Sequence, residues 1–187
     1  MILSLNDRPA LILIDIQKGF EDIRYWGGHR NNPDAEKSAS LLLNLWRQES
    51  FPVFHIQHCS ANPDSLLAEG KPGNDFQNCV LPIEGEAVIK KNVNSAFIGT
   101  DLKKRLDNLG IRKIVIAGLT TDHCISTSAR MAGNFGFDTY VVYDATATFD
   151  KTGFNGELFS AEILHDTAIA SLSGEFATII KTGELVF

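Results

Sequence analysis

Apolar runs rich in β-branched residues alternate with longer segments of helical periodicity along this chain, and that alternation constrains its fold more than any other feature. Continuous apolar runs are typical of strands buried on both faces, and helical segments between them are typical of crossovers that join parallel strands. The sequence therefore predicts an α/β fold with three layers, α/β/α, in which helices cover both faces of a six-stranded, mainly parallel sheet.

The expected elements follow from periodicity and from the residues at their ends. We expect strands over residues 10–15, 52–58, 86–91, 113–118, 138–145 and 176–182, and helices over residues 34–50, 101–109, 124–135 and 160–171. Pro33 precedes the first helix, Thr100 is the expected N-cap of the second, and Gly110 is its expected end. The strand order predicted for such a sheet is 3-2-1-4-5-6, with the strands numbered along the chain.

Composition limits the classes of protein that this chain can belong to. Its 187 residues, 44% hydrophobic and 21% charged, predict one globular domain over residues 1–187. A net charge of −6 with scattered Lys and Arg argues against nucleic-acid partners and anionic membranes. The apolar runs are too short to span a membrane, and the N-terminus lacks the features of a signal peptide. Three cysteines imply no disulfide framework, which predicts a cytoplasmic protein.

Two polar residues stand where this topology places chemistry. Ligands in open parallel sheets bind beyond the carboxyl ends of the strands, where the strand order reverses between strands 1 and 4. Asp15 ends the first expected strand, and Cys124 follows the fourth. We therefore expect them to converge. The long irregular segments 20–32 and 59–86 are the expected walls or lid of the site.

Cys124 has several interpretations by position alone. It could be inert packing, half of a disulfide, a metal ligand or a nucleophile. Its place at the start of a helix favours the nucleophile, because the positive end of the helix dipole lowers a thiol pKa. The small and polar residues before it, "GLTTDHC", offer backbone N–H groups for an oxyanion hole.

The remaining candidates are less distinct. Lys90 and Lys91 face opposite sides of their strand, and the pattern does not choose between them. His55 and His58 also point to opposite faces, so we expect no metal site and no cofactor; His58 alone could line a pocket. His123 adjoins Cys124 but points about 100° away from it on a helix, which argues against a role as the base.

Three ordered motifs carry a resemblance to a known family. The sequence "LIDIQKGF", then "KNVNSAFIGTDL", then "GLTTDHC" resembles the isochorismatase-like cysteine hydrolases, from about Ala10 to Lys181. That family includes nicotinamidases, N-carbamoylsarcosine amidohydrolase, ureidoacrylate and biuret hydrolases, and streptothricin hydrolase. Its members are commonly dimers or tetramers, so the resemblance implies a homo-oligomer.

The resemblance also implies roles for individual residues. The catalytic Asp, Lys and Cys of the family match Asp15, Lys91 and Cys124, which selects Lys91 over Lys90. The family's cis peptide corresponds to Leu119–Thr120, which would aim the N–H groups of Thr120 and Cys124 at one oxygen.

Phe20 matches a family position that packs against substrate, although core packing explains it equally well. Gln17 and Trp26 are weaker candidates for the same role.

The sequence departs from particular members of the family. The segment "VFHIQHCSANPD" does not reproduce the metal-binding histidines of nicotinamidases. True isochorismatases lack the nucleophilic cysteine and cleave a vinyl ether. We therefore expect a hydrolase that cleaves a C–N bond in a small amide, carbamoyl or lactam substrate through a thioester. The alternatives are an isochorismatase-type ether hydrolase and a non-catalytic thiol-sensing or binding protein on the same fold.

Overall fold

The computed structural model describes residue 3 and residues 7–185. Six strands form one sheet in the order β3-β2-β1-β4-β5-β8, and every neighbouring pair is parallel. The strands are β1 (Ala10–Ile14), β2 (Val53–His58), β3 (Ala87–Lys91), β4 (Lys113–Leu119), β5 (Asp138–Ala147) and β8 (Thr178–Ile180). The predicted fold class and strand order are confirmed.

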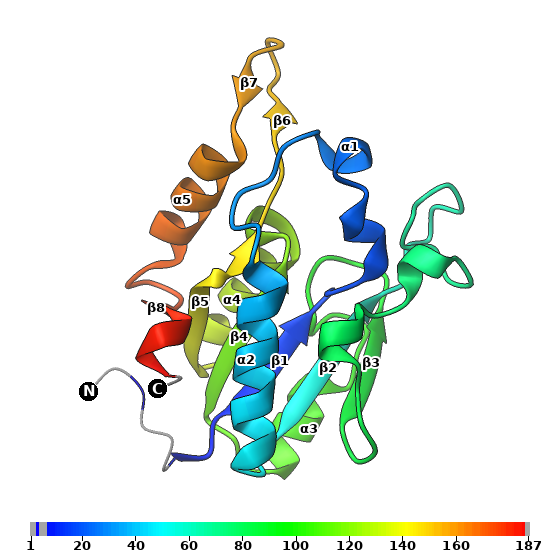
Figure 1. The fold of residues 1–187 in the computed structure, drawn as a ribbon. Helices are drawn as coiled ribbons and strands as arrows, with labels where there is room; N and C mark the ends of the chain where they lie inside the picture. The colour runs from blue at the N-terminus through cyan, green and yellow to red at the C-terminus, as the bar shows by residue number, and fades with distance from the viewer. Residues whose placement is uncertain (1–2, 4–6, 186–187) are drawn as a thin grey trace.

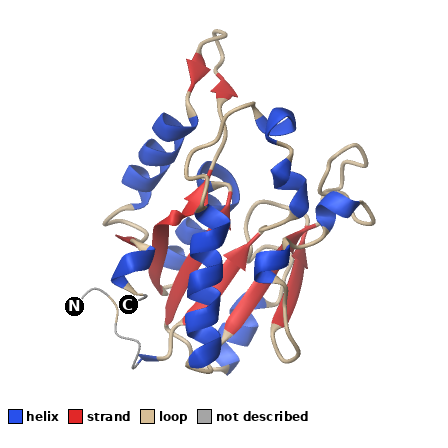
Figure 2. Ribbon diagram, in the orientation of Figure 1, coloured by secondary structure: helices blue, strands red, loops and turns tan. Residues whose placement is uncertain are grey.

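Helices cover both faces of the sheet, as Figures 1 and 2 show. Helix α2 (Ala35–Gln48) packs on one face, while α3 (Leu102–Asn108), α4 (Ser126–Asn134) and α5 (Ala161–Leu172) pack on the other. Alternate residues of β1 point into the two cores: Leu11 and Leu13 into the core under α2, and Ile12 and Ile14 into the other. A strand buried on both faces has to be apolar throughout, which explains the run "ALILI".

Helix α2 illustrates how the pattern produces the layer. Its buried side chains recur at helical spacing and form one stripe, made of Ala35, Ala39, Leu42, Leu43 and Trp46. The indole Nε1 of Trp46 donates to Pro9 O at 2.8 Å, so this large buried ring leaves no polar atom unpaired.

Some element ends differ from those expected. Asp101, not Thr100, is the N-cap residue of α3, although Thr100 Oγ1 still accepts from Leu102 N at 3.4 Å. Gly110 follows the helix with φ +67°, as predicted. The short strands β6 (Lys151–Thr152) and β7 (Leu158–Phe159) form a hairpin between β5 and α5 in the chain (Figure 1). The sequence analysis did not predict them.

Short helical turns lie between these elements and after the last strand. These are η2 (Lys18–Glu21), α1 (Ile23–Trp26), η3 (Pro72–Asn74), η4 (Asn78–Val80), a π-helical turn η5 (Thr121–Ile125) and η6 (Thr182–Glu184). Across residue 3 and residues 7–185, no helix combines the length and apolar character that crossing a membrane requires.

Candidate active site

The ends of β1 and β4 meet at the reversal of strand order. Gly118 pairs with Ile14, and a Cβ at position 118 would lie 1.9 Å from Ile14 O, so only glycine allows this approach. Asp15 follows β1 directly with φ +54°, a left-handed conformation that Asp tolerates better than most residues. The backbone therefore turns sharply where the carboxylate stands.

Lys91 is the centre of the buried polar cluster. Its Nζ lies 2.6 Å from Asp15 Oδ2, 3.0 Å from His58 Nδ1 and 3.3 Å from Cys124 Sγ, and it also donates to Val93 O at 3.2 Å. The Asp15 and Lys91 side chains are almost completely buried. Lys90 points away and pairs with Glu69 at the surface. The structure thus brings Lys91, and not Lys90, to Asp15 and Cys124.

Cys124 lies in the π-helical turn η5, which leads directly into α4. The peptide bond between Leu119 and Thr120 is cis, as the resemblance implies. Ile125 N donates to Thr120 O at 3.1 Å, a bond five residues long that widens the turn. The helical segment therefore begins at Thr121, three residues before the start that we expected.

The electrostatics of the thiol correct one expectation. Burial, together with the neighbouring carboxylate of Asp15, holds the pKa of the Cys124 thiol above its ordinary value, and Lys91 offsets only part of that effect. The lowered pKa expected from the helix terminus is therefore wrong. The resting site holds a protonated thiol beside a carboxylate, and Asp15 Oδ1 is buried with no hydrogen-bond partner among the described residues.

A cavity of about 130 Å³ opens above these groups, and we call it the site cavity. Ligand pockets usually measure about 300–1,000 Å³, so this cavity suits a small substrate. The lining residues are Asp15, Phe20, Trp26, His58, Leu67, Asn94, Thr120, His123, Cys124, Phe149 and Lys151.

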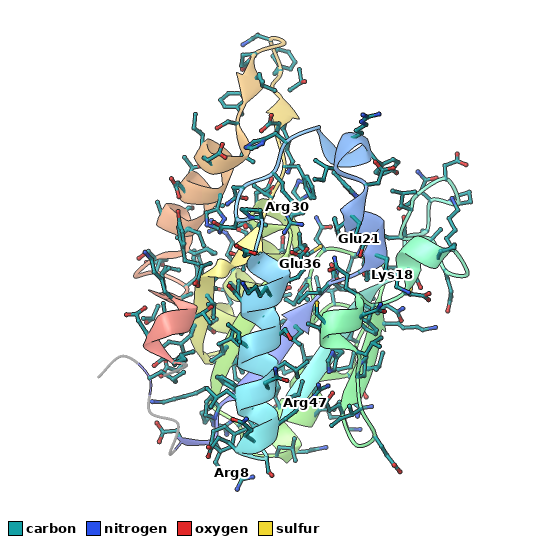
Figure 3. All side chains as sticks on the ribbon, viewed as in Figure 1. Arg8, Lys18, Glu21, Arg30, Glu36 and Arg47 are labelled. Carbon is teal, nitrogen blue, oxygen red and sulfur yellow. The ribbon has the colours of Figure 1, made fainter. Side chains whose placement is uncertain are left out.

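Aromatic rings form much of its wall. The Phe20 and Trp26 ring centroids are 4.6 Å apart, and each lies 6.1 Å from the Phe149 centroid. The Arg30 guanidinium lies over the Phe149 ring, 5.7 Å from its centroid, and pairs with Glu36 at 2.8 Å. Figure 3 shows Arg30 and Glu36 meeting above the start of α2. Phe20 and Trp26 thus both line the site cavity.

Three predicted site residues do not line the cavity: Lys91, which contacts the lining residues Asp15 and Cys124, and also Gln17 and Leu119. Gln17 does not line it, because its side chain is committed to the backbone: its amide nitrogen donates to His58 O and Asn74 O, and its Oε1 accepts from His58 N. The prediction that Gln17 touches substrate is therefore wrong, and its bonds instead hold the end of β2. Leu119 lies in the core and contributes only the cis peptide.

The two histidines of β2 separate as expected. His55 lies on the opposite face, with Nε2 2.8 Å from Glu86 Oε2, whereas His58 lines the site cavity. Burial and the Lys91 charge lower the pKa of His58, so its ring is neutral. Ligand-type atoms of Asp15, His58 and Cys124 lie within 4.8 Å of one another, a spacing that would suit a metal ion. The Lys91 ammonium already contacts all three and supplies the positive charge there.

Sequence reasoning missed part of the lining. Asn94 follows the carboxyl end of β3, and Phe149 and Lys151 follow that of β5. The rule that selected Asp15 and Cys124 also applies to these strand ends. Leu67 carried no such signal, because it comes from the irregular segment 59–86.

A parallel, doubly covered sheet with a small cavity at its carboxyl edge defines an α/β protein with the architecture of a small-molecule enzyme. Residues 9–184 match the isochorismatase domain, and the chain belongs to the isochorismatase family of hydrolases.

Relatives support this assignment over nearly the full length. The isochorismatase family protein YrdC of Bacillus subtilis is 43% identical over 97% of this chain and 96% of its own. Maleamate amidohydrolase of Pseudomonas putida is 34% identical over 86% of this chain and 82% of its own. A crystal structure of an isochorismatase-family protein from Chromobacterium violaceum superposes with a TM-score of 0.92 at 40% identity, covering 96% of this chain and 92% of the other.

Proposed function

We propose that this chain is a cysteine hydrolase that cleaves a C–N bond of a small amide, carbamoyl or lactam substrate through a thioester intermediate. The observation that carries the proposal is the position of Cys124 Sγ in the lining of the site cavity, 3.3 Å from Lys91 Nζ and within 4.8 Å of a carboxylate oxygen of Asp15. Relatives whose names state an action on amides, such as maleamate amidohydrolase, add support.

In the first half-reaction the thiol becomes the nucleophile. Asp15 Oδ1 takes the proton of Cys124 while Sγ attacks the substrate carbonyl carbon. Reference pKa values of about 8.5 for Cys and 3.9 for Asp make this transfer roughly 6 kcal/mol uphill, and burial of the thiol adds to that cost. Coupling the transfer to S–C bond formation avoids a free thiolate, and the Lys91 ammonium stabilises the negative charge that develops on sulfur.

The tetrahedral intermediate then collapses. The N–H groups of Thr120 and Cys124, presented by the cis peptide and the π-helical turn, hold the oxyanion. Asp15 returns its proton to the leaving nitrogen as the C–N bond breaks, and the amine or ammonia departs. Water, deprotonated by Asp15, attacks the remaining thioester, releases the acid and regenerates the thiol.

The test is a panel of small amides, carbamoyl compounds and lactams, with release of ammonia or amine as the readout. Mass spectrometry of the quenched reaction should detect acylation on the peptide that contains Cys124, and hydroxylamine should intercept the acyl group as a hydroxamate. If no substrate of any of these classes is hydrolysed and peroxide reversibly oxidises Cys124, the proposal is contradicted and the thiol-sensing alternative is favoured.

Two further expectations stay predictions. The resemblance implies a dimer or tetramer, which light scattering at several protein concentrations would measure. The cysteine content implies a cytoplasmic location, which fractionation of the source cells would test.

A further inference from the structure

Two polar side chains flank the mouth of the site cavity, above the buried floor. Lys151 comes from β6 and His123 from the π-helical turn, and their side chains are 31% and 57% exposed. The side chains of Asp15 and Lys91, by contrast, are almost completely buried. A substrate whose carbonyl reaches Cys124 would bring its other end to this mouth.

Lys151 is already engaged by two neighbours. Its ammonium pairs closely with Asp122 Oδ2 and lies 3.1 Å from His123 Nε2. Since an ammonium only donates, His123 Nε2 accepts, and the imidazole carries its proton on Nδ1. Of the three N–H bonds of Lys151, one is therefore left without a partner among the described residues.

Asp122 is held in its ionised form. Burial alone would raise the pKa of its carboxyl, but hydrogen bonds from Lys151 and from Thr148, whose Oγ1 donates to Oδ1 at 2.6 Å, outweigh burial and lower it. Burial, with a contribution from Lys151, lowers the pKa of His123, so this ring is neutral. The mouth thus contains one full positive and one full negative charge, in contact.

The charges of the site cavity consequently cancel. Asp15 forms an ion pair with the buried Lys91, and Asp122 forms one with Lys151. Both lining histidines are neutral, and the thiol is protonated. The remaining walls are largely aromatic and aliphatic. A substrate carboxylate would find no unneutralised cation there and would lose its hydration, which is costly. An uncharged oxygen would need only the spare N–H of Lys151.

We propose that Asp122 determines specificity: by neutralising Lys151 it restricts the site cavity to uncharged substrates, whose second oxygen or other acceptor takes the remaining Lys151 N–H. This inference rests on the function proposed above and narrows its substrate class to neutral amides and carbamoyl compounds. Asp122 acts through Lys151 and is not itself a catalytic residue.

Two alkylating reagents of similar size test the inference without any turnover. Iodoacetamide is neutral and iodoacetate is anionic, and both react with the thiolate of Cys124. The ratio of the iodoacetate rate to the iodoacetamide rate therefore cancels changes in thiolate population. N-acetylcysteine supplies the reference ratio, and peptide mass spectrometry identifies the cysteine that was labelled.

The rate ratio is measured in four proteins that together form a double-mutant cycle. The unmodified protein should give a ratio at least about tenfold below the reference, since one uncompensated charge in an apolar site costs at least that factor. Asp122→Asn leaves an oxygen to accept from Thr148 and frees the Lys151 charge, so the ratio should rise about tenfold or more. Lys151→Met should lower it. The double variant, neutral again, should return close to the starting ratio.

Turnover provides a second readout. The unmodified protein should prefer succinamide to succinamate in kcat/KM, and Asp122→Asn should reduce that preference by about tenfold. Circular dichroism and thermal unfolding check that each variant folds.

The outcomes separate the two proposals. Unchanged ratios in Asp122→Asn, or faster labelling of the unmodified protein by iodoacetate, would overturn the inference even if amides are hydrolysed. The expected ratios with no hydrolysis of any amide would contradict the proposed function alone.

Discussion

The ammonium nitrogen of Lys91 lies 2.6 Å from Asp15 Oδ2, although Lys91 ends β3 and Asp15 follows β1, two strands that β2 separates in the sheet. Both side chains are almost completely buried. Removing one member of such a pair leaves an uncompensated buried charge and typically costs about 3–5 kcal/mol. This ion pair therefore affects both stability and the chemistry of the neighbouring thiol.

Replacement of Lys91 by Met should reduce turnover at least about 10²-fold, the scale of losing one preorganised charge. The Lys91 charge partly offsets the burial of Cys124, so its loss should also raise the pKa of the thiol further. Steady-state kinetics and the pH dependence of alkylation measure the two effects. The double variant Lys91→Met with Asp15→Asn should recover stability without recovering activity.

The matched control is Lys90→Met. The side chains of Lys90 and Glu69 are 57% and 65% exposed, and an exposed ion pair contributes little to stability. Activity and stability should stay close to those of the unmodified protein. Equal losses in the two lysine variants would mean that Lys91 has no special electrostatic role.

Asp15→Asn should separate thiol reactivity from catalysis. The carboxylate raises the pKa of Cys124, so its removal should shift the alkylation profile with iodoacetamide to lower pH. Turnover should nevertheless fall by about 10²–10⁴-fold, because the proton acceptor is gone. A variant that keeps its turnover would show that another group moves the proton.

Cys124→Ala should abolish turnover while leaving the fold intact, whereas Cys59→Ala and Cys79→Ala should keep most of the activity. Cys79 is exposed, Cys59 is only partly buried, and neither lines the site cavity. Activity assays with thermal unfolding distinguish the variants. Full activity in Cys124→Ala would end the interpretation as a cysteine hydrolase.

Prolonged treatment with a chelator should leave activity unchanged. The Lys91 ammonium contacts Asp15, His58 and Cys124, the three groups whose spacing would suit a metal ion, and a second cation there would face strong repulsion. Assays before and after dialysis measure the effect. Loss of activity that zinc or manganese restores would contradict this prediction.

Acid should destabilise the protein in two steps that involve His55 and Glu86. Burial lowers the pKa of His55 from 6.5, so the ring is neutral when folded and takes up a proton on unfolding below that pH. Burial acts to raise the pKa of Glu86, but hydrogen bonds from Arg47, Ile83 N and His55 outweigh it and lower the pKa from 4.5 to about 2. Both contributions to stability are present at neutral pH; the first is lost below about pH 6.5 and the second between about pH 4.5 and 2.

Urea unfolding at a series of pH values measures this dependence. Glu86→Gln should be less stable than the unmodified protein at pH 7, and the difference between them should shrink toward pH 3. Parallel curves over the whole range would show that Glu86 contributes nothing to the acid sensitivity.

The fold was predictable because its signals are local. The run "ALILI" and the buried stripe of α2 each specify an element with its buried face, and the crossover rules leave few ways to connect such elements. The β6–β7 hairpin was not predicted because strands of two residues carry no periodicity. The start of the helical segment at Thr121 was not predicted because a π-helical turn has no distinctive pattern in the sequence.

The candidate site was predictable only in part. Topology placed Asp15 and Cys124 together, but the choice of Lys91 depended on the family resemblance. The raised pKa of Cys124 could not be predicted from the sequence, because it depends on how deeply the thiol is buried and on its distance from Asp15. The role of Gln17 was misjudged for a similar reason, since its partners are backbone atoms of residues far away in the sequence.

The Asp15–Lys91 pair links the carboxyl ends of β1 and β3 across β2, and it therefore restrains the carboxyl end of β2. His58 N donates to Gln17 Oε1, and Cys59 N donates to Lys91 O at 2.7 Å. Opening these amides to solvent would require a break in the charge pair or a separation of the three strands. In native-state hydrogen exchange, the amides of His58 and Cys59 should accordingly exchange as slowly as the centre of the sheet, and the Lys91→Met variant should release them while the amides of β4 stay protected.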